Sequence, residues 1–189
     1  SDFGKWVGGN EIMALGKGYI VRGPDSFTAT HQNYTATFVG TPNNGVINTP
    51  IERSTYTGTP YVGPTTTMVT LNDDNWNLVG NPYPSALNAD IFLASNASNI
   101  NGFVKIWTHG TLPDNMTIDP FYEDYQMNYT VADYITYNSL GSTPPGYNGM
   151  IAAGQGFFVL MNDSGATNEN IIFNNTMRSH TFNNSQFYR

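Results

Sequence analysis

The sequence predicts an all-β fold, a β-sandwich of jelly-roll type with one short helix, and three observations support this prediction. Short runs of β-branched and aromatic residues alternate with clusters of Gly, Pro and Asn that are typical of turns. Segments rich in strong helix formers are scarce. One strand-like pattern also occurs twice along the chain. Many short strands separated by such turns are characteristic of sandwiches and barrels.

The repeated pattern joins two distant parts of the chain. Met13–Val21 reads MALGKGYIV and Ile151–Val159 reads IAAGQGFFV, so both contain an apolar run, Gly-x-Gly, an aromatic residue and a final Val. Glycines inside a strand pattern suggest a bulge or a close approach of another backbone. The repetition predicts a duplicated unit within one domain over residues 1–189, with a partial copy in 1–70 and a fuller copy in 71–189.

In the first half of the chain, alternation of apolar and polar residues predicts a series of short strands. Asn44-Gly45 suits the centre of a type I′ turn, so residues 34–39 and Val46–Ile51 are expected to form a hairpin. The stretch 54–67, rich in Thr, Gly, Pro and Tyr, fits a loop, an edge strand or a connector between sheets. Further strands are expected at Ile12–Val21, Met68–Leu71 and Trp76–Val79.

The second half contains the expected helix. It begins at Ser85 or Asn88, since Asn88 or Asp90 can cap the apolar run that follows, and it ends near residues 95–96. The stretch 108–149 is the least regular part of the chain. Strands are expected at Phe103–Trp107, Met150–Met161 and Asn170–Phe173.

Composition excludes several classes of function. The 189 residues have a net charge of −7, and only 11% are charged. A nucleic-acid binder or a protein that docks on anionic membranes needs a basic face, which this acidic chain does not favour. No apolar stretch approaches the ~20 residues of a membrane-spanning helix, so membrane insertion is not expected. Cysteine is absent, which removes disulfides and Cys chemistry. Ser1-Asp2-Phe3 is unlike a natural start, so neighbouring modules of a longer chain are expected partners.

Three segments resemble a known group of proteins. They are Trp76–Ala86 (WNLVGNPYPSA), Gly154–Val159 (GQGFFV) and Phe173–Arg178 (FNNTMR). In this order they resemble the β-rich region of large secreted or cell-surface proteins of Bacteroidota that are exported by the type IX secretion system. The resemblance covers Trp76–Arg189 and, more weakly, Met13–Ile51. It implies an extracellular or cell-surface location, and it carries no catalytic residues that could be transferred to this chain.

An acidic cluster is the candidate metal site. Asp119, Glu123 and Asp124 lie within six positions of one another, and Ca²⁺ prefers hard oxygen ligands grouped in a loop. The spacing does not match an EF-hand, so a solvated acidic loop is the favoured interpretation and a Ca²⁺ site is the alternative. Glycoside hydrolysis also needs two carboxylates, but no pair in the sequence is marked for that role. His180 and the other histidines lack the spacing of metal ligands and are interpreted as surface or turn residues.

Aromatic residues near this cluster are the candidate ligand-binding residues. Trp107, Tyr122, Tyr125 and Tyr129 lie in a stretch that is also rich in Asn, Asp and Thr. Sugars stack on flat aromatic faces, while amides and carboxylates bond their hydroxyl groups. The same residue types suit a loop that packs over the sheet, because Tyr can bury its ring while its hydroxyl stays in water. Packing is the favoured interpretation, and a role in recognition of a polysaccharide stays open.

These observations lead to one functional prediction and one alternative. The chain is expected to be a non-catalytic structural or adhesive β-sandwich module of a secreted or surface-exposed bacterial protein. The alternative is a carbohydrate-binding module attached to a secreted enzyme or adhesin. No Gly-x-Ser-x-Gly elbow or other catalytic constellation marks the sequence as an enzyme.

Overall fold

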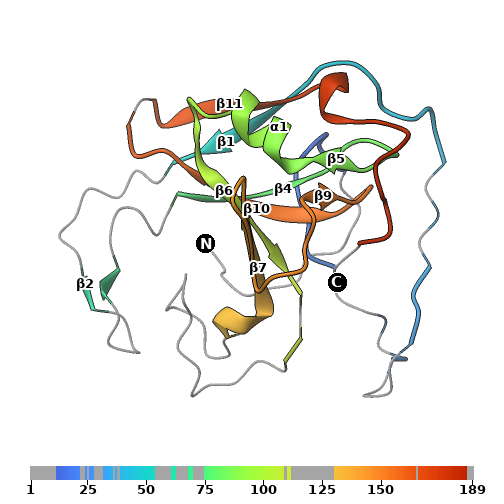
Figure 1. The fold of residues 1–189 in the computed structure, drawn as a ribbon, viewed down its shortest axis with the longest axis horizontal. Coiled ribbons are helices and arrows are strands. Elements are labelled where there is room, and N and C mark those ends of the chain that lie inside the picture. The colour runs from blue at the N-terminus through green and yellow to red at the C-terminus, as the bar shows by residue number, and fades with distance from the viewer. Residues whose placement is uncertain are drawn as a thin grey trace.

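Among the residues that the structure describes, the largest sheet has five antiparallel strands, and Figure 1 shows how it lies relative to the other elements. The computed structural model describes residues 12–21, 24, 26–27, 32–35, 37, 39–53, 61–62, 68–69, 75–108, 110–111, 130–164 and 166–186. In spatial order the sheet contains β4 (Trp76–Gly80), β10 (Gly156–Met161), β6 (Ile100–Trp107), β7 (Tyr134–Asn138) and β8 (Gly141–Thr143).

Three antiparallel pairs and three short helices complete the described part of the chain. These elements confirm the predicted all-β sandwich with one short α-helix, and the jelly-roll connectivity stays a prediction. The pairs are β1 (Ile47–Glu52) with β11 (Asn168–Phe173), β2 (Tyr61–Val62) with β3 (Met68–Val69), and β5 (Leu87–Asn88) with β9 (Met150–Ile151). The helices are α1 (Ala89–Ser95) and the 3₁₀ turns η2 (Val131–Asp133) and η3 (Asn175–Met177).

Helix α1 begins where the sequence predicts. Asn88 has an extended backbone, and its Oδ1 accepts a hydrogen bond of 3.0 Å from the backbone N–H of Ile91. This bond satisfies one of the backbone donors that every helix start leaves free. The helix ends at Asn96, whose N–H bonds to the carbonyls of Phe92 and Leu93. The predicted cap and the predicted end near 95–96 are therefore both confirmed.

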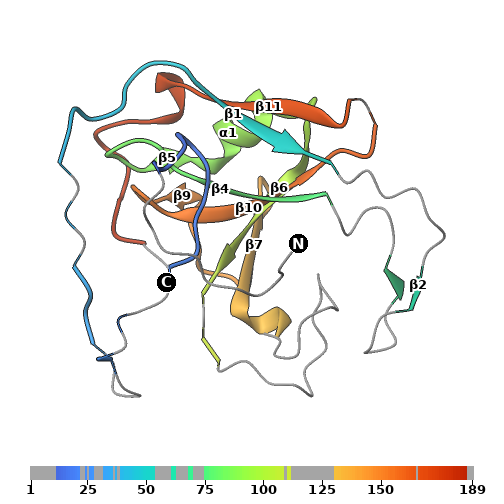
Figure 2. The ribbon, with the colours of Figure 1, turned by 180° about the vertical axis from the view of Figure 1, so that it is seen from behind.

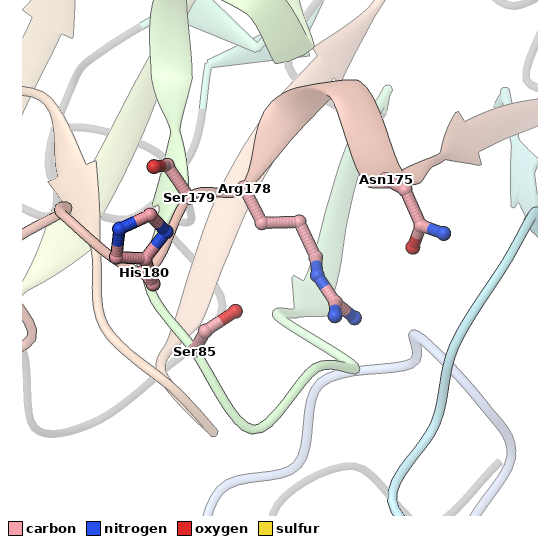
Figure 3. A pocket seen from close by; sticks show the side chains of 5 residues that line it. All are labelled: Ser85, Asn175, Arg178, Ser179 and His180. Carbon is pink, nitrogen blue, oxygen red and sulfur yellow. The ribbon is translucent and has the colours of Figure 1, made fainter.

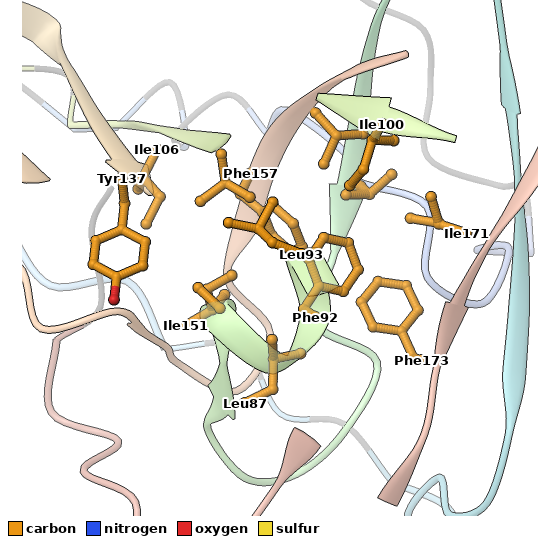
Figure 4. Packing of buried hydrophobic residues seen from close by; sticks show 14 of the residues in the cluster. Leu87, Phe92, Leu93, Ile100, Ile106, Tyr137, Ile151, Phe157, Ile171 and Phe173 are labelled. Carbon is orange, nitrogen blue, oxygen red and sulfur yellow. The ribbon is translucent and has the colours of Figure 1, made fainter. Parts of the chain in front are cut away.

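The core lies between the five-stranded sheet and the β1–β11 pair, and α1 supplies its central side chain (Figure 4). Phe92 of α1 meets Phe157 of β10 edge to face, with ring centroids 5.4 Å apart. Its other side stacks on Phe173 of β11 at 5.2 Å. All three rings are fully buried, and each buried ring of this size stabilises the fold by roughly 1.5–3 kcal/mol. These three residues therefore join the two layers.

The two copies of the repeated pattern have the same local geometry. Gly16 has φ +74° and Gly154 has φ +71°, both in the left-handed region that glycine tolerates without steric cost. In each copy the residue after this glycine donates its N–H to the carbonyl three residues earlier, at 3.2 and 3.1 Å respectively. The repeated sequence is thus a repeated turn. The division into residues 1–70 and 71–189 stays a prediction.

Both copies lie against β4, one on each side (Figure 2). On one side Gly156 of β10 pairs with Gly80. On the other side the Gly18 N–H donates to the Leu78 carbonyl at 3.0 Å, and the Gly80 N–H donates to the Gly16 carbonyl at 2.8 Å. A Cβ on Gly18 would lie 2.5 Å from Leu78 Cγ, so this close approach requires glycine. The first copy thereby covers an otherwise open strand edge, the usual site of unwanted pairing between chains.

The predicted hairpin around Asn44-Gly45 is wrong. β1 pairs with β11 instead, and the described residues between 34 and 39 form no strand. The turn is held by other parts of the chain. The Gly45 N–H donates to Asn175 Oδ1 at 3.1 Å, and the Gly45 carbonyl accepts from the Tyr83 hydroxyl at 2.6 Å. Pairing with β11 places β1 residues such as Ile51 in the core, a gain that a local hairpin does not supply.

Three further predictions need correction. The strand expected at Ile12–Val21 does not form, because the left-handed Gly16 turns the chain there and Lys17 makes an isolated bridge with Val79. The expected strand Met150–Met161 is divided into β9 and β10, because the left-handed Gly154 turns the chain between them. The stretch 108–149, predicted to be irregular, contributes β7 and β8. In β7 the side chains of Ile135 and Tyr137 are buried in alternation, so the period of two was present there. The 54–67 stretch contains β2, which pairs with β3.

Candidate functional site

Of the predicted ligand-binding residues, Trp107 is the one that the structure describes. It ends β6, is half-buried and lies opposite Tyr134 of β7. The other predicted site residues lie outside the described part of the chain: the binding residues Tyr122, Tyr125 and Tyr129, and the metal candidates Asp119, Glu123 and Asp124. In the part that the structure does describe, no group of three or more His, Asp or Glu residues could hold a metal ion.

Trp107 belongs to a larger group of rings on the outer face of the five-stranded sheet, away from the core. Side chains alternate across a strand, so the strand registers place these rings on one face. Trp76 and Phe103 pack edge to face, with ring centroids 5.9 Å apart, and Tyr134 and Phe158 do so at 6.1 Å. We call this surface the aromatic face, and its rings are Trp76, Phe103, Trp107, Tyr134 and Phe158.

Lys105 lies within the aromatic face. On β6 it is opposite Phe158 on one side and Thr136 on the other, and its Nζ lies 5.2 Å from the centroid of the Trp76 ring. Burial lowers the pKa of Lys105 to about 8, because the charged form loses hydration there. The ammonium is therefore charged at neutral pH and becomes neutral in mildly alkaline solution. A cation beside Trp gains from the negative ring face.

A buried carboxylate joins the two residues that flank 112–129. Asp133 is 1% exposed. Its oxygens accept hydrogen bonds from the N–H and hydroxyl of Thr111, at 2.8 and 2.6 Å, and from those of Thr130, at 2.9 and 3.0 Å. Burial acts to raise the pKa of Asp133, but these four bonds to the charged form outweigh it, and the pKa is lowered. The sequence does not mark Asp133 as special, because its partners Thr111 and Thr130 are far apart along the chain.

The most specific sequence motif, WNLVGNPYPSA, is built around Asn81. This side chain is 4% exposed. Its Nδ2 donates to the carbonyls of Ser85, Ile151 and Ala152 at 2.9, 3.0 and 3.0 Å, and its Oδ1 accepts from the N–H of Tyr83 at 3.0 Å. One amide therefore holds the loop after β4 against the end of β9. Buried backbone groups need such partners, because leaving them unpaired costs free energy.

The same motif meets FNNTMR at a pocket of about 460 Å³ (Figure 3). An antiparallel bridge between Leu87 and Arg178 brings the two segments together. Both motifs are visible in the sequence, but their contact is not, and the sequence predicts that His180 is a surface or turn residue. His180 is exposed, and it is also part of this pocket. The described residues that line the pocket are Ser85, Asn175, Arg178, Ser179 and His180.

Arg178 is the strong cation of this pocket. Its Nη1 donates to the Asn43 carbonyl at 3.3 Å, and its guanidinium lies 4.5 Å from the centroid of the Tyr83 ring. Burial raises the pKa of the Tyr83 hydroxyl, and the nearby positive charge of Arg178 acts in the opposite direction. Two neutral groups thus position the guanidinium without neutralising it. In Figure 3 the Arg178 side chain extends between Ser85 and Asn175.

Comparison with known proteins gives one result. No curated protein and no solved structure matches the chain. Within the described residues, no helix is long and apolar enough to span a bilayer. A protein-family model does match over residues 1–189. The chain belongs to the family described as Domain of unknown function (DUF8693).

Proposed function

We propose that this domain is a non-catalytic structural or adhesive module of a secreted or surface-exposed bacterial protein. The observation that carries the proposal is how Asn81 is used. The central polar residue of the most specific motif bonds four backbone groups inside the molecule. A chain without cysteine cannot fix its loops with disulfides. Buried amides are an alternative cross-link, which is unaffected by oxidation and by ordinary variation in pH.

Asn96 forms a second cross-link of this kind, and we call each of the two buried side chains, Asn81 and Asn96, an amide bracket. It is 2% exposed. Its Nδ2 donates to the carbonyls of Phe92 and Ile172 at 2.9 and 3.0 Å, and its Oδ1 accepts from the Ile172 N–H at 2.7 Å. This amide ties the end of α1 to β11. Brackets that do not titrate suit a protein exposed to changing surroundings, and the resemblance to exported proteins of Bacteroidota agrees with that role.

The proposal is tested on bacteria that produce the parent protein. An antibody against the domain should label intact cells or the culture medium, and a control antibody against a cytoplasmic protein should label lysed cells alone. Labelling of the domain only after lysis would overturn the location. In parallel, the purified domain should turn over no substrate in a panel of polysaccharides and esters. Turnover that persists through repeated purification would overturn the non-catalytic role.

A carbohydrate-binding module is the second candidate, and the aromatic face supports it. Trp107 and Tyr134 are neighbours across β6 and β7, and Tyr134 packs on Phe158. Half-buried rings gathered on one sheet face are the type of side chain on which sugars stack. The Asp133 bonds also fix Thr111 and Thr130, the two ends of the stretch that holds the predicted binding tyrosines.

Affinity electrophoresis through gels that contain plant or algal polysaccharides tests this second candidate. Retention should fall several-fold for Trp107→Ala and Tyr134→Ala, because each removes a stacking surface. Tyr34→Ala is the matched control, since Tyr34 is 63% exposed and lies outside the aromatic face. Retention that is equal in all three variants would exclude the aromatic face as the binding surface.

A further inference from the structure

We infer that the pocket between the GNPYPS loop and η3 binds the carboxylate of an acidic sugar residue, a hexuronate. The inference goes beyond the proposed function, because the pocket is separate from the aromatic face. It is formed by residues before β5 and by the segment at and after η3. Its volume of about 460 Å³ lies within the usual range of roughly 300–1,000 Å³ for small-molecule sites.

The polar groups that remain available in this pocket are mainly donors. Ser85 Oγ is buried and has no hydrogen-bond partner among the described residues, although buried hydroxyls normally have one. Two acceptors of the lining are already occupied. Asn175 Oδ1 accepts a hydrogen bond from the Gly45 N–H at 3.1 Å, and Ser179 Oγ accepts one from the Thr181 N–H at 3.2 Å. The Ser85 hydroxyl, the Asn175 amide nitrogen and the guanidinium are therefore left to donate to a ligand.

The charge of the pocket selects an anionic group. Arg178 contributes a full positive charge, and its contacts with Asn43 and Tyr83 are to neutral groups. None of the described lining residues is acidic. Such a pocket is distinctive in a chain with a net charge of −7. A guanidinium matches the geometry of a carboxylate, with which it can form two parallel hydrogen bonds.

The remaining lining favours a sugar over a phosphate. Protein phosphate sites generally combine several cations, or use a row of backbone N–H groups. This pocket instead contains one guanidinium surrounded by the neutral hydroxyl and amide groups of Ser85, Asn175 and Ser179, and by the ring of His180. A hexuronate presents the complementary set, which is one carboxylate surrounded by hydroxyl groups.

Isothermal titration with two matched ligands tests the inference. Trigalacturonate and the neutral galactotriose differ at C6, where the first has a carboxylate and the second a hydroxymethyl group. The protein should bind the acidic trimer at least ten times more tightly, and the preference should decrease in high salt. Equal affinity for the two trimers would overturn the inference. Tighter binding of inorganic phosphate or of a sulfated galactose would also overturn it.

Two variants locate the site without depending on a folding defect. Ser85→Ala removes a hydroxyl that makes no hydrogen bond within the described part of the chain, so thermal stability should be unchanged or higher, while affinity for trigalacturonate should fall about three- to tenfold. Arg178→Lys keeps the charge but loses the planar fork, and affinity should fall about tenfold. Lys17→Ala removes a positive charge at an exposed position outside the pocket and should bind normally, because the net charge of the chain does not determine the affinity. Unchanged affinity in Ser85→Ala and Arg178→Lys, with both variants folded, would refute the assignment.

Discussion

Replacing Asn81 by Ala tests the idea that a buried amide bracket holds the loops of this domain. The side chain is 4% exposed and makes four hydrogen bonds to the backbone. Its partners are the carbonyls of Ser85, Ile151 and Ala152 and the N–H of Tyr83. Alanine would leave these groups without their side-chain partner and would open a small void.

The expected cost follows from these four bonds. Each buried group that loses its partner costs ~1–3 kcal/mol. Water that enters the void can restore part of the lost bonding, so we expect a net loss of about 3–5 kcal/mol in the free energy of unfolding. Natural domains are stable by only ~5–15 kcal/mol. The Asn81→Ala protein should therefore be strongly destabilised, although it buries almost the same apolar surface as the wild type.

Urea unfolding followed by tryptophan fluorescence measures this loss through the midpoint and the slope. Asn168→Ala is the control, because Asn168 is exposed and, among the residues that the structure describes, its side chain bonds the neighbouring Thr167 hydroxyl alone. Its cost should stay within ~0.5 kcal/mol. Asn81→Asp keeps the acceptor but turns a carboxylate toward three carbonyls. It should be at least as damaging at pH 7 and should recover partly in acid, where the protonated group can donate again. A loss below ~1 kcal/mol for Asn81→Ala, with an unchanged slope, would refute the bracket.

Three further predictions follow from the described contacts. Gly18→Ala would place a Cβ 2.5 Å from Leu78 Cγ, so the free energy of unfolding should fall by ~1–3 kcal/mol. Hydrogen exchange of the amides that join the first copy to β4 should also become faster. Gly102→Ala is the control, because a Cβ there would meet open space, and it should have neither effect. Hydrogen bonds lower the pKa of Asp133 against the opposing effect of burial. Its carboxylate therefore stabilises the fold above pH ~4, and this stabilisation is lost as the pH falls through the folded-state pKa. Asp133→Asn should be less stable at pH 7, and its stability should depend less on pH in acid unfolding. Burial lowers the pKa of Lys105 to about 8, so the stability of the wild type should rise above pH 8, where the unfolded chain still keeps the lysine proton. Lys105→Met should be more stable than the wild type at pH 7 by about 1–2 kcal/mol, after allowance for partial exposure. Urea titrations in alkaline solution should show no such rise for this variant.

Much of the local structure could be predicted because its causes lie within a few residues of each other. Asn88 caps α1 through a bond to Ile91, three positions later. β4 and β6 follow the expected apolar patterns, and the repeated Gly-x-Gly pattern marks two turns with nearly equal φ at Gly16 and Gly154. Such features depend on backbone sterics and on side chains that reach only their neighbours in sequence.

The failed predictions share a different cause. Asn44-Gly45 has the composition of a hairpin turn, yet β1 pairs with β11, more than a hundred residues away. That pairing buries Ile51 and Phe173 in one core. The burial of large apolar side chains is worth more than the preference of a two-residue turn. A turn pattern therefore indicates where the chain bends, and it does not identify the strand that follows as the partner of the strand before.

The candidate sites divide in the same way. Trp107 could be singled out because aromatic residues are visible in the sequence, and its neighbours on the aromatic face follow only from strand registers. The Asp133 bonds and the Arg178 pocket were missed, since each depends on residues from separate segments.

The order of residues in this chain was sufficient for its all-β class, its capped helix, its repeated turn and its acidic surface chemistry, because each of these depends on composition or on spacings of a few positions. Tertiary structure alone decided which strands pair, which asparagines become buried brackets, and that Ser85 and Arg178 line one pocket. The physical reason is that these contacts join residues whose meeting depends on how the whole core closes, and core closure is a collective result of burying many apolar side chains at once.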